Sequence, residues 1–523
     1  MKKQILPLAL VAATLSSPFA SAQISFGGSP VGLSDVKSSL PAAPVQVMPA
    51  VDALTLMVED AELLATGNKR MRFGQNHSTD LTLDNSGVWS TLPNGDRVWQ
   101  LGIECPGALS VNFEFNTYVV PEGGQVFVYN PLGHVLGSFT AASNPGHTEL
   151  GVDLMMGDRI TIEYIEPATA VGQGQLRIGQ VTHGYRDVLG MTKGFGDSGS
   201  CNNNAVCPIN VGYTDQIRSV AMLVSGGSGF CTGQLLDNCA HDGTPYFLTA
   251  NHCLVGNPGT WVFRFNWQSP VCTPNTNAPT NQTVSGATLL ASGAGSDYGF
   301  LELNTAPPAS YNVFFTGWDK SGVTPPECRG IHHPSGDIKK FTINDDALGQ
   351  ANVNLGNGSA ACWQIFDWED GTTEGGSSGS GLWDENSRLV GQLYGGQANC
   401  SNNVNDYYGR FAVTYPNLTT WLGSCGNTID GIGGNVGVNE PGALPVFTVF
   451  PNPGTGLFTI GYLGNNGQVH LRVCDAMGRV VKDGSTPASD KVSLDLSDVS
   501  DGVYTLEVMA SGARSVQRIV VQR

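Results

Sequence analysis

Charged side chains are scarce in this sequence: they make up 13% of its 523 residues, against about 25% in an average domain. Positive charge is the scarcer sign, because 26 Lys and Arg stand against 44 Asp and Glu and give a net charge of −18. The chain also has no run of basic residues. Phosphate backbones are bound by clustered Lys and Arg, so this composition excludes a typical nucleic-acid-binding protein.

Long hydrophobic runs are also missing. Beyond the first 22 residues no stretch reaches the roughly 18 apolar residues of a membrane-spanning helix, so we expect no transmembrane segment. The apolar run at residues 5–15 follows the basic Met1-Lys2-Lys3 and precedes Ala20-Ser21-Ala22, a small-x-small motif. This pattern is typical of a cleavable export signal and predicts a signal peptide over residues 1–22.

Glycine, in contrast, is abundant, with 68 residues. Low charge together with many Gly, Asn, Ser and Thr residues favours β-sheets joined by turns over helical bundles. The 41% of apolar residues suffices for several hydrophobic cores, and the length corresponds to about three domains. We therefore expect an all-β protein.

The 12 cysteines are unevenly distributed. Cys105 lies early and Cys474 lies late, whereas the other ten fall between Cys201 and Cys425. Export makes disulfides permissible. An even number in one segment predicts up to five bridges within one secreted domain.

Composition shifts divide the rest of the chain. Residues 23–193 begin as a Pro- and Ser-rich arm and continue as alternating β sequence, for example at 123–129 and 159–164, without a cluster of catalytic residue types. The Cys-rich segment 194–425 reads as many short strands, typical of a barrel or sandwich. A Gly-rich linker at 426–445 precedes alternating β sequence over 446–523.

The strongest chemical motif is Gly375-Gly-Ser-Ser378-Gly-Ser-Gly381. A Ser among glycines can occupy a tight turn, with its hydroxyl exposed and neighbouring N–H groups converging where an oxyanion forms. A flexible Gly/Ser loop is the alternative interpretation.

A candidate general base lies in Phe247-Leu-Thr-Ala-Asn-His252-Cys253. A Ser hydroxyl is a weak nucleophile, and His is the side chain that titrates near neutral pH and can activate it. A lone His at the end of an apolar strand can equally be a packed loop residue.

The candidate that would orient this His is Asp297, which opens the apolar run Tyr298–Leu303. A buried Asp can fix the tautomer of an imidazole. Asp297 could instead be a turn residue, and Asp319 is a rival for the same role. We prefer Asp297, which gives the chain order His252, Asp297, Ser378, the order of chymotrypsin-like enzymes.

The segment from Cys201 to about Leu422 resembles the bacterial lysyl endopeptidases, a branch of the trypsin-like serine proteases. The matching motifs, in chain order, are Gly199-Ser-Cys201, Cys207-Pro208, Cys231-Thr-Gly233, Thr249-Ala-Asn-His252-Cys253, Ile331-His-His-Pro334, Gly376-Ser-Ser378-Gly-Ser380, Leu389-Val-Gly-Gln-Leu393 and Asp406-Tyr-Tyr-Gly-Arg410.

The resemblance implies a trypsin-like double β-barrel and a set of roles. Ser378 would be the nucleophile, His252 the general base, and Asp297 the residue that orients it. The N–H groups of Gly376 and Ser378 would form the oxyanion hole. No cofactor is expected. Three disulfides are also implied, Cys201–Cys400, Cys207–Cys272 and Cys231–Cys253, and three pairings remain open for Cys239, Cys328, Cys362 and Cys425.

Specificity would depend on Asp406, which matches the acidic residue that binds the substrate Lys in this family. A buried carboxylate is costly without a cation, so it should favour Lys or Arg side chains. Asp406 could instead pair with Arg410. Tyr394 and Gly395 are further candidate substrate-binding residues. Tyr394 stands where some relatives have a His stacked on a Trp, and no matching Trp is assigned.

Three further sites bear on activation and on metals. Ser377 stands where trypsin-type zymogens carry the Asp that pairs with the new N-terminus, so that activation switch is absent. Lys193-Gly194 precedes the Cys-rich domain at the point where the mature chain of relatives begins, and a Lys-specific protease could release itself there. His332-His333 could be a metal pair, but no third ligand is evident and no metal site is expected.

The C-terminal region contains four short motifs: Phe450-Pro-Asn-Pro453, Gly456-Leu-Phe-Thr-Ile460, Asp501-Gly-Val-Tyr504 and Val520-Val-Gln-Arg523. With these motifs it resembles the sorting domain of the type IX secretion system. This implies a β-sandwich that engages the secretion machinery and delivers the protein to the cell surface or the medium.

These observations predict a secreted serine endopeptidase that cuts after Lys and is made as a self-processing precursor. Its partners would be protein or peptide substrates, its own propeptide and the secretion machinery. A trypsin-like protease with Arg or relaxed preference is one alternative. A non-catalytic surface adhesin on a protease scaffold is the other.

Overall fold

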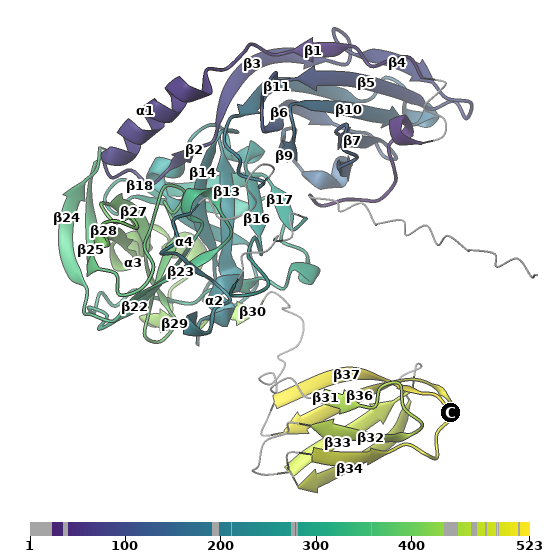
Figure 1. Cartoon of the computed structure of the whole chain (residues 1–523), viewed down its shortest axis with the longest axis vertical. Coiled ribbons are helices and arrows are strands. Elements are labelled where there is room, and N and C mark those ends of the chain that lie inside the picture. The colour runs from purple at the N-terminus through teal and green to yellow at the C-terminus, as the bar shows by residue number, and fades with distance from the viewer. Residues whose placement is uncertain are drawn as a thin grey trace, which may run out of the picture. The chain divides into compact units, whose positions relative to one another are not determined.

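The computed structural model describes residues 23–34, 40–190, 198–210, 212–273, 278, 281–356, 358–433, 448–461, 468–475, 479–487, 489, 491–510 and 513–523. The chain divides into two units, residues 1–434 and 435–523 (Figure 1). The first unit contains an N-terminal β-sandwich and the Cys-rich region, and the second contains the C-terminal sheets. Among the described residues, no helix is long and apolar enough to span a bilayer.

The N-terminal sandwich is built from the alternating sequence. In β10, Ile160, Ile162 and Tyr164 are fully buried on one face, whereas the other face carries exposed Arg159 and buried Glu163. One sheet has the order β1-β5-β10-β7-β8 with β4 on β5, and the other has the order β3-β11-β6-β9. The strands are β1 (Val45–Val47), β3 (Gly74–Thr82), β4 (Val88–Thr91), β5 (Arg97–Glu104), β6 (Ser110–Val119), β7 (Gln125–Tyr129), β8 (Val135–Phe139), β9 (Leu150–Met156), β10 (Arg159–Glu166) and β11 (Gln175–Gly184).

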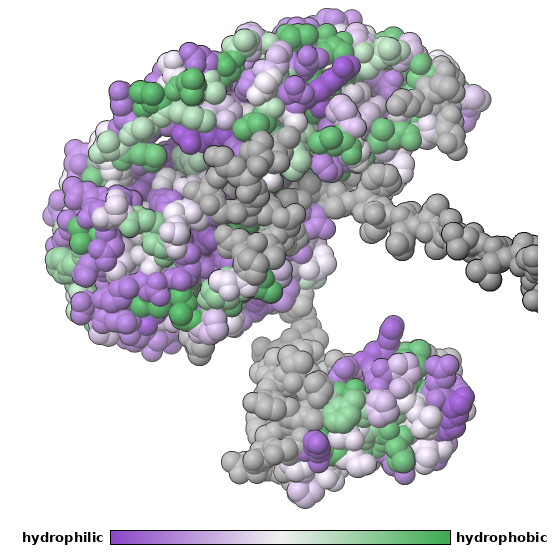
Figure 2. Space-filling model, in the orientation of Figure 1, coloured by the Kyte–Doolittle hydropathy of each residue, from purple (hydrophilic) through white to green (hydrophobic). Residues whose placement is uncertain are grey.

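A helix that the sequence analysis did not predict, α1 (Ala53–Ala65), follows β1. Its N-cap is Asp52, whose carboxylate accepts a hydrogen bond from the N–H of Thr55. The helix is rich in Ala and Leu but leaves Leu54 and Val58 exposed, and Figure 2 shows hydrophobic residues over this part of the surface. Beyond it, β2 (Met71–Arg72) pairs with strand β14 of the Cys-rich region.

The first half of the Cys-rich region is a sheet that closes on itself. Its order is β17-β16-β13-β14-β15-β19-β18, and the two edge strands β17 and β18 are one continuous segment bent at Gly286. Gly286 has φ +81°, and a Cβ there would lie 2.6 Å from Asn304 Nδ2, so this bend requires glycine. The strands are β13 (Val220–Ser225), β14 (Gly229–Leu236), β15 (Tyr246–Ala250), β16 (Val262–Phe265), β17 (Thr283–Ser285), β18 (Ala287–Gly293) and β19 (Tyr298–Leu303).

The second half has the order β12-β23-β22-β26-β27-β28-β25-β24. It also curls back on itself, because Asp370, which follows β25, bridges Ile343 of β23. The elements are β12 (Asn203–Asn204), β21 (Trp318–Asp319), β22 (Cys328–His332), β23 (Lys340–Asn344), β24 (Gly349–Asn354), β25 (Ser359–Asp367), β26 (Gly381–Asp384), β27 (Leu389–Gly396), β28 (Val404–Arg410), β29 (Thr428–Ile429), the pair β20 (Phe314–Phe315) and β30 (Ile432–Gly433), and helices α2 (Thr214–Ser219), α3 (Phe411–Thr414) and α4 (Thr419–Leu422). The expected all-β, trypsin-like double barrel is confirmed.

Four disulfides cross-link this region. Three are the pairings that the resemblance implies, and the fourth joins two of the cysteines left open: Cys201–Cys400, Cys207–Cys272, Cys231–Cys253 and Cys239–Cys425. Cys328 and Cys362 are free, buried thiols, so the region holds four bridges rather than five. Cys105 and Cys474 are also free.

The C-terminal unit is a small sandwich of two antiparallel sheets. Their orders are β31-β32-β35 and β34-β33-β36-β37. Buried Phe458, Ile460 and Leu506 contribute to the core between them. The strands are β31 (Thr448–Phe450), β32 (Leu457–Gly461), β33 (Gln468–Cys474), β34 (Val480–Pro487), β35 (Lys491–Asp495), β36 (Gly502–Ala510) and β37 (Ala513–Val521).

Candidate active site

The candidate site lies where the two barrels meet. His252 follows β15 in a single turn, Asn251–Cys253, and Asp297 directly precedes β19, the neighbour of β15 in the first barrel. Ser378 comes from the second barrel, in the turn before β26. The disulfide between Cys253 and Cys231 ties the turn of His252 to β14.

The three side chains form a continuous hydrogen-bonded chain. His252 Nδ1 is 2.7 Å from Asp297 Oδ2, and His252 Nε2 is 2.6 Å from Ser378 Oγ. The backbone N–H of His252 also donates to Asp297 Oδ1, at 3.2 Å. The side chains of His252 and Asp297 are only 2% and 1% exposed. Burial raises the pKa of Asp297, and His252 opposes that shift.

The rival Asp319 does not join this chain. It lies in β21 and accepts a hydrogen bond from the N–H of Ser321, a local turn contact. Asp297 has the backbone conformation of a constrained residue, with φ +53°, and its carbonyl accepts a hydrogen bond from Asn251 N. The structure therefore brings Asp297, and not Asp319, to the imidazole of His252.

The turn of Ser378 is locked between the barrels. The N–H of Thr232 in β14 donates to Ser378 O at 2.8 Å, and Thr232 Oγ1 donates to Gly376 O at 2.8 Å. Gly379 has φ +82°, and a Cβ there would lie 2.2 Å from Thr249 Oγ1. The glycines of the motif are thus required by close backbone approach and are not a flexible loop.

The substrate side of this site is filled by residues 67–72 of the same chain. Asn68 lies opposite Gly395 of β27 in an antiparallel bridge, and Gly396 N donates to Gly67 O at 3.0 Å. The backbone N–H of Gly376 donates to the carbonyl of Lys69. Gly376 is one of the two expected oxyanion-hole residues, and Ser378 lies two residues further along the same turn.

The side chain of Lys69 enters a buried pocket whose floor is Asp406. Lys69 is 7% exposed, and its Nζ donates to the carbonyl oxygens of Thr373, at 3.1 Å, and Ala398. Nζ lies 3.9 Å from Asp406 Oδ1. Burial lowers the pKa of Lys69, and the charge of Asp406 opposes this shift.

Asp406 lies in β28 and is completely buried. Its Oδ2 accepts hydrogen bonds from Trp368 Nε1, at 2.9 Å, and Thr373 Oγ1, at 2.6 Å, while Oδ1 has no hydrogen-bond partner among the described residues and faces the pocket. Arg410, the alternative partner of Asp406, instead donates to Gln350 and lies over the ring of Trp363.

Tyr394 and Gly395 line the same edge. The hydroxyl of Tyr394 donates to Gly358 O at 2.9 Å, and its ring centroid is 6.0 Å from that of His252. At Gly395 a Cβ would lie 2.4 Å from Gly67 O, so a side chain here would displace the bound segment.

Ser377 is held in the interior, with Oγ 2.7 Å from His332 Nδ1. His332 and His333 are both buried, and burial together with nearby Lys side chains lowers the pKa of His332 to about 3 and that of His333 well below its usual range. His333 Nδ1 contacts the carbonyl of Asp337 rather than converging with His332 on a common point.

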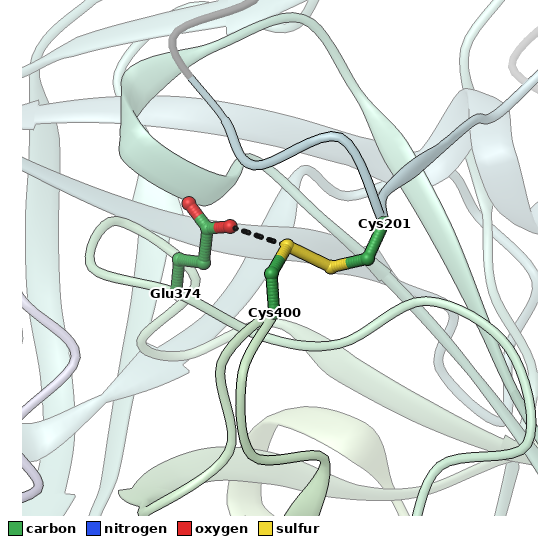
Figure 3. A group of neighbouring side chains, drawn as sticks. All are labelled: Cys201, Glu374 and Cys400. Atoms are coloured by element: carbon green, nitrogen blue, oxygen red, sulfur yellow. Dashed lines mark hydrogen bonds between the residues drawn. A yellow bond between two sulfur atoms is a disulfide. The ribbon is translucent and has the colours of Figure 1, made fainter.

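A cluster with the ligand types of a metal site is drawn in Figure 3. Glu374 has a carboxylate oxygen 3.5 Å from Cys400 Sγ, and Cys400 is bonded to Cys201. Because the two sulfurs are bonded to each other, neither is a thiolate ligand. Glu374 also accepts from Gly199 N and from Ser335 Oγ. The cluster ties the N-terminal end of the Cys-rich region to residues next to Thr373 and Ala398 of the Asp406 pocket.

Lys69 is the residue that the sequence analysis missed. Lys193 and Gly194, the expected processing site, lie outside the described residues. Lys occurs only three times between residues 23 and 193, at positions 37, 69 and 193. The scarcity of Lys in this segment is the one signal in the sequence that points to Lys69 as a candidate occupant of the pocket.

Comparison with known proteins decides the family. Residues 195–409 match the family described as "Lysyl endopeptidase, C-terminal domain". The lysyl endopeptidase of Pseudomonas aeruginosa is 30% identical over 375 residues, a match that spans 64% of this chain and 77% of that protein. The chain belongs to the lysyl endopeptidase family.

The C-terminal unit has a match of its own. Residues 448–522 match the "Secretion system C-terminal sorting domain". Among solved structures, the active form of the Rv3671c protease from M. tuberculosis gives a TM-score of 0.30 at 13% identity, over 42% of this chain and 88% of that one. Human heparin binding protein gives 0.28 at 16% identity, over 40% and 94%. With its family and its sorting tail, this lysyl endopeptidase family member is a secreted serine endopeptidase.

Proposed function

We propose that this protein hydrolyses peptide bonds on the carboxyl side of Lys, with Ser378, His252 and Asp297 as catalytic residues, and that it is made as a self-processing precursor. The observation that carries the Lys preference is the position of Lys69. Its ammonium group lies in the pocket whose buried floor is Asp406, and its carbonyl accepts the hydrogen bond from Gly376 N.

The pocket offers an ammonium group two hydrogen-bond acceptors and one counter-charge. A Lys ammonium has three donors, and here it faces two carbonyl oxygens, of Thr373 and Ala398, together with Oδ1 of Asp406. An uncompensated carboxylate in this interior would be costly, so the pocket favours a cation. A guanidinium is a wider, planar fork that does not match three converging acceptors, which supports Lys over Arg.

The proposed reaction follows from the hydrogen-bonded chain. Ser378 Oγ attacks the carbonyl carbon while His252 Nε2 removes its proton, and Asp297 holds the proton of His252 on Nδ1. The N–H of Gly376, and by expectation that of Ser378, stabilise the oxyanion. His252 then protonates the departing amine. Water, activated in the same way, hydrolyses the acyl-enzyme and frees Ser378.

The proposed precursor has a signal peptide (1–22), a propeptide (23–193), the protease domain (194–425), a linker (426–445) and a sorting domain (446–523). A cut after Lys193 would separate the propeptide from the protease domain. Residues 67–72 of the propeptide cover the cleft, which supports an inactive precursor. The sorting domain would engage the secretion machinery.

Replacing Asp406 tests the pocket. In Asp406→Asn the shape of the residue is kept but a Lys substrate loses its counter-charge. We expect kcat/KM for a Lys peptide to fall about a hundred- to several-thousand-fold, with little change for the same peptide carrying Leu. Asp319→Asn removes the rival carboxylate outside the site and serves as the matched control. Equal losses in the two variants would contradict the proposed pocket.

Replacing Ser378 tests the proposed catalytic role. Wild type and Ser378→Ala are incubated with a mixed protein substrate, and every cut is mapped by mass spectrometry. Cuts after Lys by wild type alone support the proposal, whereas cuts after Arg as well favour the relaxed alternative. If wild type freed of residues 23–193 cuts nothing and both proteins bind the same surface ligands, the adhesin alternative holds.

A further inference from the structure

Residues 67–72 cross the active site as one extended segment, on both sides of the catalytic turn. Before Lys69, the chain pairs with Gly395 and Gly396 at the end of β27. After Arg70, β2 pairs with β14, with Met71 opposite Phe230. Antiparallel pairing of this kind on both sides is how an extended peptide is added to sheet edges when it is bound as a ligand.

The segment also has a defined register. The carbonyl held by the N–H of Gly376 is that of Lys69, and the side chain in the Asp406 pocket is that of Lys69. The peptide bond presented to Ser378 is therefore the one between Lys69 and Arg70, and the chain is continuous there.

We propose that the Lys69–Arg70 bond is itself a cleavage site, cut by Ser378 of the same molecule as the first step of maturation. This inference rests on the proposed function. Ser378 Oγ bonds to the carbonyl carbon of Lys69, and its proton passes through His252 to the nitrogen of Arg70 as the C–N bond breaks. Water then converts the Lys69 ester into a carboxylate and returns the proton to Ser378.

The order of events is set by occupancy. One cleft holds one scissile bond, and residues 67–72 fill it on both sides of Ser378. Neither Lys193–Gly194 nor an external peptide can enter until this segment has moved. Because the nicked ends are joined to the rest of the chain on one side only, they leave the cleft more readily than the intact segment, and we expect cleavage after Lys69 to precede every other cut that the same molecule makes.

A cluster of side chains, the Asp60 clamp, ties the two sides of this bond together. It consists of Asp60 in α1, on one side, and Arg72, Tyr185 and Arg186 on the other. Asp60 Oδ1 accepts from Arg72 Nε at 2.7 Å, and Oδ2 accepts from Tyr185 at 2.7 Å and from Arg186 at 2.8 Å. Asp60 is 5% exposed, whereas the side chains of Arg72 and Arg186 are 26% and 24% exposed, so these contacts are partly shielded from water and salt.

The Asp60 clamp controls the equilibrium between the chain cut after Lys69 and the intact chain. The amine of Arg70 stays beside the acyl group at a high effective concentration, and this favours re-formation of the bond over hydrolysis of the acyl-enzyme. The nicked molecule also keeps its cleft filled. Loosening the clamp should shift the balance toward the nicked chain.

The test monitors the termini of the full-length precursor as it refolds from urea with its disulfides intact. Samples are quenched in acid, and new ends are identified by mass spectrometry for wild type, Ser378→Ala, Lys69→Gln and Asp60→Ala. Lys482→Gln, an exposed Lys of the sorting domain, is the matched control. Hydrolysis of an external Lys peptide is measured in parallel.

We expect an Arg70 N-terminus to appear before any Gly194 terminus, at a rate that does not depend on protein concentration. It should be present in wild type and Lys482→Gln and absent in Ser378→Ala and Lys69→Gln. In Asp60→Ala the nicked fraction should rise several-fold. The order and concentration dependence are measured on wild type, so they hold even if a variant folds poorly.

The proposal is overturned if wild type and Asp60→Ala hydrolyse the external Lys peptide but never form an Arg70 terminus. It is also overturned if that terminus appears after the Gly194 terminus or forms faster at higher protein concentration. Failure to hydrolyse the external peptide after removal of residues 23–193 contradicts the proposed function instead, so the two failures are distinguishable.

Discussion

The buried ion pair between Asp153 and Arg264 provides a quantitative test of how the N-terminal sandwich is held on the first barrel. Asp153 lies in β9 of the sandwich and Arg264 in β16 of the barrel. Arg264 Nη2 donates to both carboxylate oxygens at 2.8 Å, and the two side chains are 0% and 1% exposed. Asp153→Ala leaves the guanidinium buried without its partner.

The expected magnitude depends on what else Arg264 could contact. Its Nε and Nη1 have no hydrogen-bond partner among the described residues, and its remaining neighbour of note is the ring of Trp267, 4.8 Å away. Within that described part of the chain no second acceptor replaces Asp153, so the loss should reach the full cost of breaking a buried pair, about 3–5 kcal/mol. This corresponds to a sandwich held about a hundred- to several-thousand-fold less tightly.

Urea titration in the inactive Ser378→Ala background measures this cost. All nine Trp residues lie between positions 89 and 421, so Trp fluorescence reports on the first unit alone. Asp80→Ala is the control, because the Asp80–Arg177 pair is exposed and should contribute within about 1 kcal/mol. Adding Arg264→Leu to Asp153→Ala should recover most of the loss. An Asp153→Ala precursor as stable as Asp80→Ala would refute the reasoning.

Three further predictions use the same titration. Burial against the first barrel raises the pKa of Glu114 to about 7. The contribution of protonated Glu114 to the free energy of unfolding is therefore fully present below about pH 4.5 and is lost as the pH rises through about 7. Wild type should lose about 3 kcal/mol from pH 4.5 to pH 8 that Glu114→Gln retains, and parallel pH profiles of the two proteins would contradict this. Gly379→Ala places a Cβ 2.2 Å from Thr249 Oγ1 at φ +82° and should cost about 2–4 kcal/mol, whereas an unchanged midpoint would show that the turn can relax. Replacing Cys239 and Cys425 together by Ser opens a loop that spans 186 residues and should cost about 2–5 kcal/mol, and a smaller loss would mean that the unfolded chain is already compact.

The candidate site could be predicted in part because several of its residues lie in short local sequence motifs. The geometry of the Gly-rich turn of Ser378 and of the strand that precedes His252 is set by neighbouring residues. The residue types and their order along the chain were therefore sufficient to predict Ser378 and His252 as site residues. Asp297 and Asp319 both sit beside apolar strand residues, and local sequence favoured one without excluding the other. The structure separates them, because only Asp297 directly precedes the strand that pairs with β15. The helix α1 was not foreseen, because the sequence analysis assigned no element between the N-terminal arm and the alternating strands.

The sequence by itself determined the family, the all-β class and the C-terminal sorting domain, since these depend on composition, alternation and the order of short motifs. Only the tertiary structure decided which cysteines pair outside the three family bridges and which peptide occupies the cleft. Lys69 and Asp406 are separated by more than 300 positions, and no local pattern links them. They meet because the sandwich is held to the first barrel by contacts such as Asp153–Arg264, which carry the short segment 67–72 across the junction of the two barrels.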